Sequence, residues 1–137
     1  HASGVFTCMK EELVLMKRSA TSGAVVVNLS SAFAPWGVRL STSTSGDRGD
    51  MVAAMTRSTA KHVGDRGIRV VCVQPRMVDT PLLTRYRKKH GDLLSECPLG
   101  RIASANEIAE VILFLCDSSK ASYMTGCSVP VHGGAEG

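Results

Sequence analysis

The amino-acid sequence predicts an α/β protein whose strands form part of a doubly wound parallel sheet, and three observations support this prediction. Short apolar runs begin at Ala24, Ile68 and Cys127, as expected of strands that are covered on both faces. Longer segments between these runs repeat apolar residues at helical spacing. Strands that alternate with helices pair in parallel through crossover connections. We therefore expect three strands and about three to four helices in a single domain, residues 1–137.

Each predicted element has its own signal in the sequence. The three strands are expected at residues 24–31, 68–73 and 127–131. The first helix places four apolar residues on one face: Val5, Met9, Leu13 and Met16. The second begins at Asp50, and Gly64 is placed to end it. The third begins at Ser104, which forms a capping box with Glu107.

Composition narrows the class of protein. The chain has 137 residues, of which 44% are hydrophobic, and this suits one domain. No apolar run reaches membrane-spanning length and no leader precedes the first helix, so we expect no membrane segment. The cysteines are odd in number and form no Cys-x-x-Cys pair, which favours buried free thiols in a reducing, cytoplasmic compartment. The histidines do not stand at ligand spacing with acidic residues, so no metal site is predicted.

The net charge of +4 does not indicate a nucleic-acid partner. Much of the excess lies in the short run from Arg85 to His90, which we interpret as a solvated surface loop. Aromatic residues make up only 4% of the chain, and among these cations only Tyr86 could stack on a base.

Several motifs follow one another in an order that resembles the short-chain dehydrogenases/reductases. Each is weak alone, and it is their order and spacing that carry the resemblance. They are the strand ending in Ser30-Ser31, the strand start Gly67-Ile68-Arg69-Val70, the turn Pro75-x-x-Val78-x-Thr80, the segments Pro98-Leu99-Gly100-Arg101-Ile102 and Asn106-Glu107-Ile108-Ala109-Glu110, and the closing Tyr123-Met124-Thr125-Gly126 and Val129-Pro130-Val131-His132-Gly133-Gly134.

The resemblance implies a Rossmann-like fold and an NAD- or NADP-dependent oxidoreductase of small alcohol or carbonyl substrates. It places Ser31 as the serine that binds the substrate oxygen. It also places Pro75, Val78 and Thr80 at the nicotinamide, and His1 at the position of the family's water-binding asparagine. Arg76 replaces a usual glycine, which is a strained exchange if that position needs positive φ. Asn28 is interpreted as a structural strand residue.

The chain resembles only the C-terminal half of the family. It contains no Gly-x-Gly-x-x-Gly or Gly-x-x-x-Gly-x-Gly turn, the feature that surrounds the dinucleotide phosphates. We therefore expect the N-terminal dinucleotide-binding half to be absent from this chain. The segment with Arg85 to His90 corresponds to the family's substrate lid, which leaves a role in binding an acidic substrate open.

The family's Tyr-x-x-x-Lys motif is missing. Counting back along the second helix places Ser45 and Gly49 at its two positions, whereas counting forward from Ser31 places Thr44 and Arg48 there. An aliphatic hydroxyl is a far weaker acid than a phenol. Residues 41–49 are all small, polar or charged, and their plainer interpretation is a loop.

Two functions therefore remain open. In the first, the chain belongs to an oxidoreductase that retains hydride transfer. In the second, it is a catalytically inactive family member that serves as an oligomerisation or structural subunit. The second is open because the family's homo-oligomers form through the helices that correspond to residues 5–16 and 51–63.

Overall fold

The computed structural model describes residues 2–19, 23–31, 46–90 and 97–135. Three strands form one sheet in the order β1-β2-β3, and both pairings are parallel. The register pairs Val26 with Val70, and Cys72 with Ser128. The strands are β1 (Val25–Leu29), β2 (Arg69–Pro75) and β3 (Ser128–Val131). The predicted α/β class and the parallel sheet are thus confirmed.

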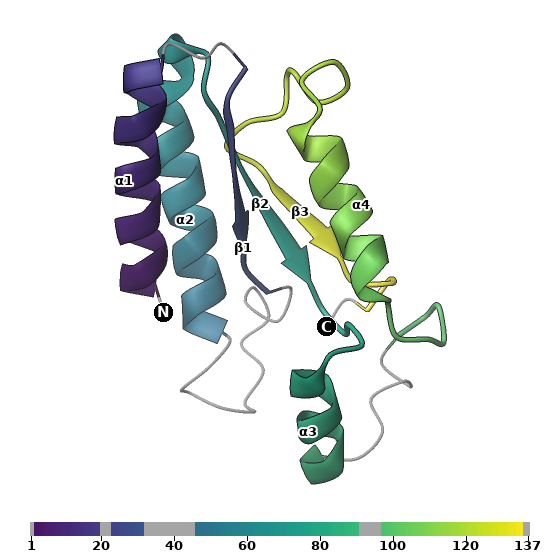
Figure 1. The fold of residues 1–137 in the computed structure, drawn as a ribbon. Coiled ribbons are helices and arrows are strands. Elements are labelled where there is room, and N and C mark those ends of the chain that lie inside the picture. Colours follow the sequence, from purple (N-terminus) through teal and green to yellow (C-terminus); the bar gives the residue numbers. More distant parts are fainter. Residues whose placement is uncertain (1, 20–22, 32–45, 91–96, 136–137) are drawn as a thin grey trace.

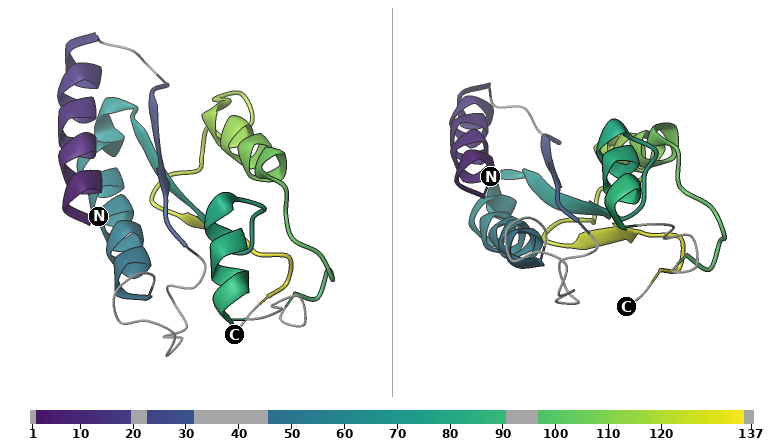
Figure 2. Two further views of the ribbon diagram at one scale, coloured as in Figure 1. Left: turned by 60° about the horizontal axis from the view of Figure 1, so that its bottom comes forward. Right: turned by 90° about the horizontal axis from the view of Figure 1, so that it is seen from below.

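Four α-helices and one short 3-10 helix accompany the sheet within the described residues (Figure 1). They are α1 (Ala2–Ser19), α2 (Gly46–Val63), the 3-10 helix η1 (Gly64–Arg66), α3 (Pro81–His90) and α4 (Ala105–Cys116). Helices α1 and α2 cover one face of the sheet and α4 covers the other, and Figure 2 shows the same division from two further directions. Helix α3 lies beyond the carboxyl ends of the strands.

The alternation of side chains along β2 explains the two layers. Val70 belongs to the core with Met9, Val26 and Ala60 on the α1 and α2 side. Val71 and Val73 belong to the core with Ile108 and Leu115 on the α4 side. Because successive side chains of a strand point to opposite faces, a strand covered on both sides is apolar at nearly every position, which is the pattern that predicted it.

Helix α4 begins as the sequence predicts. The Glu107 backbone N–H donates to Ser104 Oγ over 3.3 Å, and the Ser104 N–H donates to Glu107 Oε2 over 2.8 Å. This reciprocal pair satisfies two backbone donors at the start of the helix. The capping box is therefore confirmed.

Two loop predictions are wrong. Residues 85–90 lie in α3, because Thr80 and Pro81 provide a helix start and no glycine or proline interrupts the segment that follows. Residues 46–49 form the first turn of α2, so the loop expected over residues 41–49 is contradicted there, and residues 41–45 lie outside the described residues. At the other end of α2, Gly64 opens η1, and the left-handed residue that ends it is Gly67, at φ 70°.

Candidate active site

Ser31 lies just beyond the carboxyl end of β1, and it is half-buried. The preceding residue is fixed to the sheet, since the Ser30 N–H donates to Val73 O over 2.9 Å. Open parallel sheets bind ligands at the carboxyl ends of their strands. The sequence-predicted serine therefore lies at the edge where this architecture places a site.

The turn that follows β2 lies at the same edge. Val78 forms an isolated parallel bridge with Ala103. In that bridge the Asp79 N–H donates to Ala103 O over 2.8 Å, and the Ala103 N–H donates to Met77 O over 3.0 Å. Because both bonds use the neighbours of Val78, the N–H and C=O of Val78 itself are directed to the opposite edge of the turn. This edge combines one donor with one acceptor.

Thr80 links the turn to α3. Its hydroxyl donates to Val78 O over 3.3 Å and accepts from the Leu83 N–H, also over 3.3 Å. The second contact satisfies a backbone donor in the first turn of α3, as an N-cap residue does. Thr80 therefore contacts both the Val78 carbonyl and the helix that follows.

Arg76 stands where the family has glycine, and it fixes the turn to the end of β3 and to the segment after it. Its backbone N–H donates to Val131 O over 3.2 Å, and its guanidinium donates to Ala135 O. Next to it, Met77 is buried in a small core with Cys97 and Ala135. The arginine thus adds side-chain contacts that a glycine lacks.

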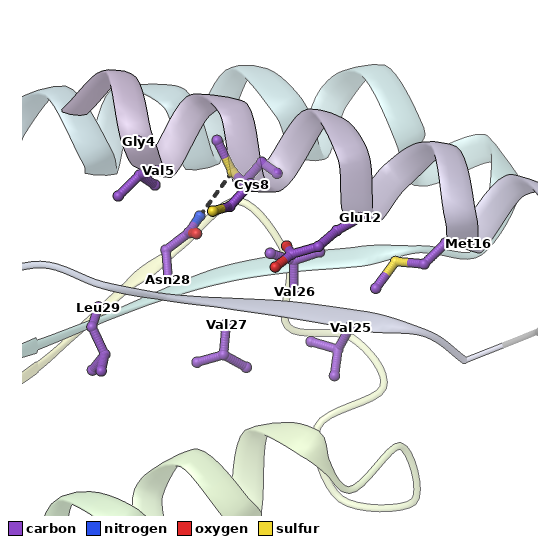
Figure 3. A pocket seen from close by; sticks show the side chains of 11 residues that line it. Gly4, Val5, Cys8, Glu12, Met16, Val25, Val26, Val27, Asn28 and Leu29 are labelled. Carbon is purple, nitrogen blue, oxygen red and sulfur yellow. Dashed lines mark hydrogen bonds between the residues drawn. The ribbon is translucent and has the colours of Figure 1, made fainter. Parts of the chain in front are cut away.

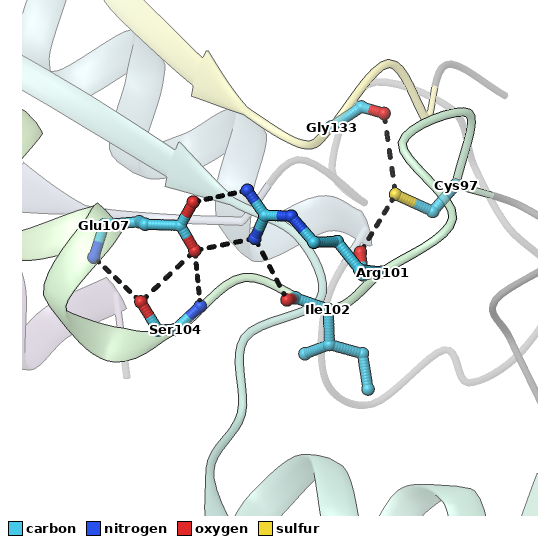
Figure 4. Close-up of polar contacts among 6 residues, drawn as sticks. All are labelled: Cys97, Arg101, Ile102, Ser104, Glu107 and Gly133. Atoms are coloured by element: carbon cyan, nitrogen blue, oxygen red, sulfur yellow. Dashed lines mark hydrogen bonds and ion pairs between the residues drawn. The ribbon is translucent and has the colours of Figure 1, made fainter.

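The segment that supports the turn is fixed by an ion pair (Figure 4). Arg101 donates to both carboxylate oxygens of Glu107, over 2.9 and 2.7 Å. These bonds, together with the Ser104 backbone N–H, lower the pKa of Glu107 to about 2. The pair is exposed, so its effect is mainly to orient residues 101–104, which include the bridge partner Ala103.

Cys97 joins the same segment to the residues that follow β3. The thiol of Cys97 donates to Arg101 O over 3.3 Å and to Gly133 O over 3.5 Å (Figure 4). Gly133 has φ 63°, and a Cβ there would lie 2.8 Å from Cys97 Sγ. Only glycine fits this position, both conformationally and sterically.

Neither tyrosine supplies a phenol from the family's position. Tyr123 is fully exposed and precedes β3, at the opposite end of the strands from Ser31. Tyr86 lies in α3. Of the residues at the Tyr and Lys positions, Arg48 and Gly49 belong to α2. Ser45, Thr44 and His1 lie outside the described residues.

An apolar groove of about 620 Å³ runs between α1 and the outer edge of β1 (Figure 3). Val26 and Asn28 point from β1 toward α1, while Val25 and Val27 point to the other side of the sheet. Cys8 and Glu12 are among the α1 residues that line it. In the described sheet β1 is an edge strand, hydrogen-bonded only to β2.

Asn28 is a buried polar residue on the floor of this groove. Its amide Nδ2 donates to Thr56 Oγ1 over 2.9 Å and lies 3.1 Å from Met9 Sδ, a contact drawn in Figure 3. Thr56 is completely buried, and its hydroxyl donates to Val52 O over 2.8 Å. The strand and the two helices on this face therefore meet at one polar cluster, as expected of a structural residue.

The remaining sequence expectations concern metals, thiols and membranes. In the described part of the chain no group of three or more His, Cys, Asp or Glu could hold a metal ion, and no helix is long and apolar enough to cross a membrane. All five cysteines are free, but the expectation that they are buried is wrong for Cys8 and Cys116, which are exposed. Burial raises the pKa of the Cys72 thiol in the middle of β2, so it stays protonated and unreactive.

A family model described as enoyl-(acyl carrier protein) reductase matches residues 1–136 of this chain. A 3-oxoacyl-[acyl-carrier-protein] reductase of Thermotoga maritima is 36% identical over 110 residues, which are 80% of this chain and 44% of that protein. The chain belongs to the short-chain dehydrogenase/reductase family.

Solved structures of this family have the same fold. A short-chain dehydrogenase/reductase of Brucella melitensis is 30% identical with a TM-score of 0.76, over 85% of this chain and 47% of that one. A 3-ketoacyl-(acyl-carrier-protein) reductase of the same organism, solved as a complex with NADH, is 28% identical with a TM-score of 0.67, over 81% of this chain and 43% of that one. The chain thus spans about half the length of the relatives it matches.

Sequence reasoning missed the residues that support the turn. Ala103 hydrogen-bonds the two neighbours of Val78 through its backbone, and the side chains of Arg101 and Cys97 fix the segment that contains Ala103. The nearest signal in the sequence is the motif Pro98 to Ile102, which contains Arg101 and lies between Cys97 and Ala103.

Proposed function

We propose that this chain provides the substrate-side half of an NAD(P)(H)-dependent oxidoreductase that acts on alcohol or carbonyl substrates. The main support is the edge of Val78 that faces away from Ala103, with one backbone donor and one acceptor. A carboxamide carries a donor and an acceptor side by side, so this edge fits the carboxamide of nicotinamide. When bound, the nicotinamide would supply hydride transfer. NAD and NADP share this group, so the proposal covers both.

The chain's own residues would orient the two reactants. Ser31, at the carboxyl end of β1, would donate a hydrogen bond to the substrate oxygen. Pro75 would shape the turn, and Thr80 would add a hydroxyl to the carboxamide contact. The Thr80 proton is directed at Val78 O in this structure, so the hydroxyl would rotate on binding. By the same resemblance, His1 would occupy the position of the water-binding asparagine.

Proton transfer is the weak part of this site. The positions of the family's tyrosine and lysine are occupied by Ser45 and Gly49, or by Thr44 and Arg48 in the other register. A positioned general acid contributes about 10²–10⁴-fold in rate, and an aliphatic hydroxyl supplies little of it. We therefore propose that the protein still binds dinucleotide and substrate but converts the substrate inefficiently.

The dinucleotide phosphates need a binding turn that this sequence does not contain. We propose that a further segment of the natural polypeptide supplies it and packs in the groove between α1 and β1. The groove is apolar, and among the described strands β1 is paired on one side only, which leaves its other edge to an additional parallel strand. Free thiols in all five cysteines favour a reducing, cytoplasmic location.

The test is a thermal titration of the full-length polypeptide with NADH and with NADPH. A specific site adds about 2.7 kcal/mol of stability at a ligand concentration of 100 times Kd. Val78→Pro removes one N–H from the proposed carboxamide contact, whereas the matched Val78→Ala keeps it. We expect the ligand-induced shift to weaken in Val78→Pro alone. No shift with either dinucleotide in the parent would remove the cofactor from this proposal.

A second candidate function, oligomerisation, is favoured by the outer surface of α1. Phe6 and Val14, about 80° apart around the helix, are 57% and 47% exposed there, a pattern more typical of an interface than of a solvated helix. We propose that this surface contacts a second copy of the chain. Sedimentation should show an oligomer that dissociates in Phe6→Glu with Val14→Lys. The matched change Leu113→Lys, on the exposed side of α4, should leave it intact. A parent that is monomeric at all concentrations would exclude this role.

A further inference from the structure

Gln74 differs from the other buried polar residues in the described part of the chain. Four polar or charged residues are buried there: Asn28, Thr56, Arg69 and Gln74. The side chains of the first three form hydrogen bonds. Gln74 is 6% exposed, and no hydrogen bond joins its side-chain amide to another group of the described residues. Because a buried amide without a partner costs free energy, this exception indicates a role other than support of the fold.

Gln74 lies at the edge of the sheet that carries the candidate site. It is the residue before Pro75, with which β2 ends. The Ser30 N–H donates to Val73 O, so Gln74 stands beside the end of β1 that leads to Ser31. The turn that contains Val78 follows directly after β2. Gln74 is therefore close to the proposed substrate serine and to the start of the proposed cofactor turn.

The side chain of Gln74 is directed to the face of the sheet that α1 and α2 cover. Successive side chains of a strand point to opposite faces. Val70 belongs to the core on the α1 and α2 side, whereas Val71 and Val73 belong to the core on the α4 side. Neither amide atom of Gln74 is among the fully enclosed polar atoms that lack a partner. The buried stem of the side chain therefore ends in an amide that a ligand can reach.

We propose that Gln74 determines substrate specificity: its side-chain amide binds a hydroxyl group that the substrate carries near the reacting carbonyl or alcohol. The inference rests on the proposed oxidoreductase function, and it narrows the substrates to hydroxyketones and the corresponding diols. The amide offers Nε2 as a donor and Oε1 as an acceptor, so a hydroxyl can pair with it in either orientation. An amide carries no charge to balance a carboxylate, which favours a neutral group on the substrate.

Thermal stability without any ligand tests whether the Gln74 amide lacks a structural partner. Gln74→Met keeps the length of the side chain and removes the amide. Asn28→Leu is the matched control, because Asn28 is also 6% exposed on the same face of the sheet but is bonded to Thr56. In the full-length polypeptide we expect Gln74→Met to unfold about 2 °C above the parent and Asn28→Leu about 4 °C below it. A Tm of Gln74→Met below that of the parent would overturn the proposal.

Binding of two matched ketones tests the specificity itself. Hydroxyacetone and 2-butanone differ only by a hydroxyl in place of a methyl group, and their Kd values can be compared by saturation-transfer NMR. We expect the parent to bind hydroxyacetone about tenfold more tightly than 2-butanone, and this preference to fall to about twofold or less in Gln74→Met. A parent without the preference, or a preference that survives in Gln74→Met, would refute the role of Gln74.

The same measurement without dinucleotide separates this inference from the proposed function. We expect the preference for hydroxyacetone both with and without NADH, because Gln74 belongs to the protein and not to the cofactor. If NADH and NADPH leave the Tm of the parent unchanged while the preference is present, the cofactor proposal fails and the binding role of Gln74 stands. Gln74→Asn, which retains a shorter amide, should keep part of the preference, and a complete loss in both variants alike would contradict recognition through the amide.

Discussion

Arg69 offers a quantitative test of how α4 is joined to the sheet. It begins β2, yet it is only 6% exposed. Its guanidinium donates to Leu115 O over 2.8 Å, in the last turn of α4, and to Met124 O over 3.4 Å. The first bond satisfies one of the carbonyls that every helix end leaves without an internal partner. The charge also complements the negative end of the helix dipole.

Replacing Arg69 with methionine keeps much of the side-chain stem and removes the charged donors. Hydrogen bonds to charged groups contribute about 1.5–3 kcal/mol each. With one short bond and one long bond lost, we expect a decrease in unfolding free energy of about 2.5 kcal/mol. An unfolding entropy of about 2.1 cal/mol/K per residue converts this into a fall in Tm of about 9 °C for a chain of 137 residues.

The assay is urea denaturation followed by circular dichroism, with Tm measured in parallel. Arg69→Lys keeps the charge but not the forked donors, and it should fall between the parent and Arg69→Met. Arg66→Met is the matched control, because Arg66 is exposed in η1. A loss below about 0.5 kcal/mol in Arg69→Met, no larger than the surface control, would refute this account of the contact.

Three further predictions concern the site and its support. The pKa of Glu107 is about 2 instead of its usual 4.5, so its contribution to stability is complete above about pH 4.5 and is lost as the pH falls toward 2. Glu107→Gln should therefore flatten the fall in Tm over that pH range. An acid profile of Tm that does not change in this variant would contradict the role of the bonds between Glu107 and Arg101. Thr80→Val should destabilise α3 by about 1 kcal/mol through loss of its cap, and hydrogen exchange of α3 amides should show it, whereas protection equal to the parent would rule out the cap. In the full-length polypeptide, Ser45→Tyr with Gly49→Lys should raise NADPH- or NADH-dependent reduction of a ketone by about 10²–10⁴-fold, with each single variant near the parent; equal activity in parent and double variant would refute the assignment of the two positions.

The strands were predictable because their signal is local. β2 is buried along most of its length, and continuous burial produces the apolar run that the sequence shows. Its observed start at Arg69 and end at Pro75 each differ from the prediction by one or two residues, since hydrogen bonding and not hydrophobicity sets strand ends. The parallel topology then follows, and it places Ser31 and Val78 at one edge without further information.

The parts that escaped prediction depend on contacts between distant residues. The run of cations from Arg85 suggested a loop, but Thr80 and Pro81 provide a helix start whose effect outweighs charge composition. The bridge between Val78 and Ala103 joins residues far apart in the chain, and their apolar side chains give no sign of a backbone bridge. The role of Arg69 could not be predicted, because its partners are backbone carbonyls and no sequence pattern indicates such contacts.

The position of β1 at the border of the described sheet has a practical consequence for handling the protein. A strand border of five residues that is rich in valine is a template on which a compatible extended peptide can add. At high concentration such borders join to one another, and the product is an insoluble deposit. Purification yield should therefore improve when a lysine replaces Leu29, which is 52% exposed at the end of β1, or when a short synthetic strand is supplied during refolding, and light scattering would record the difference.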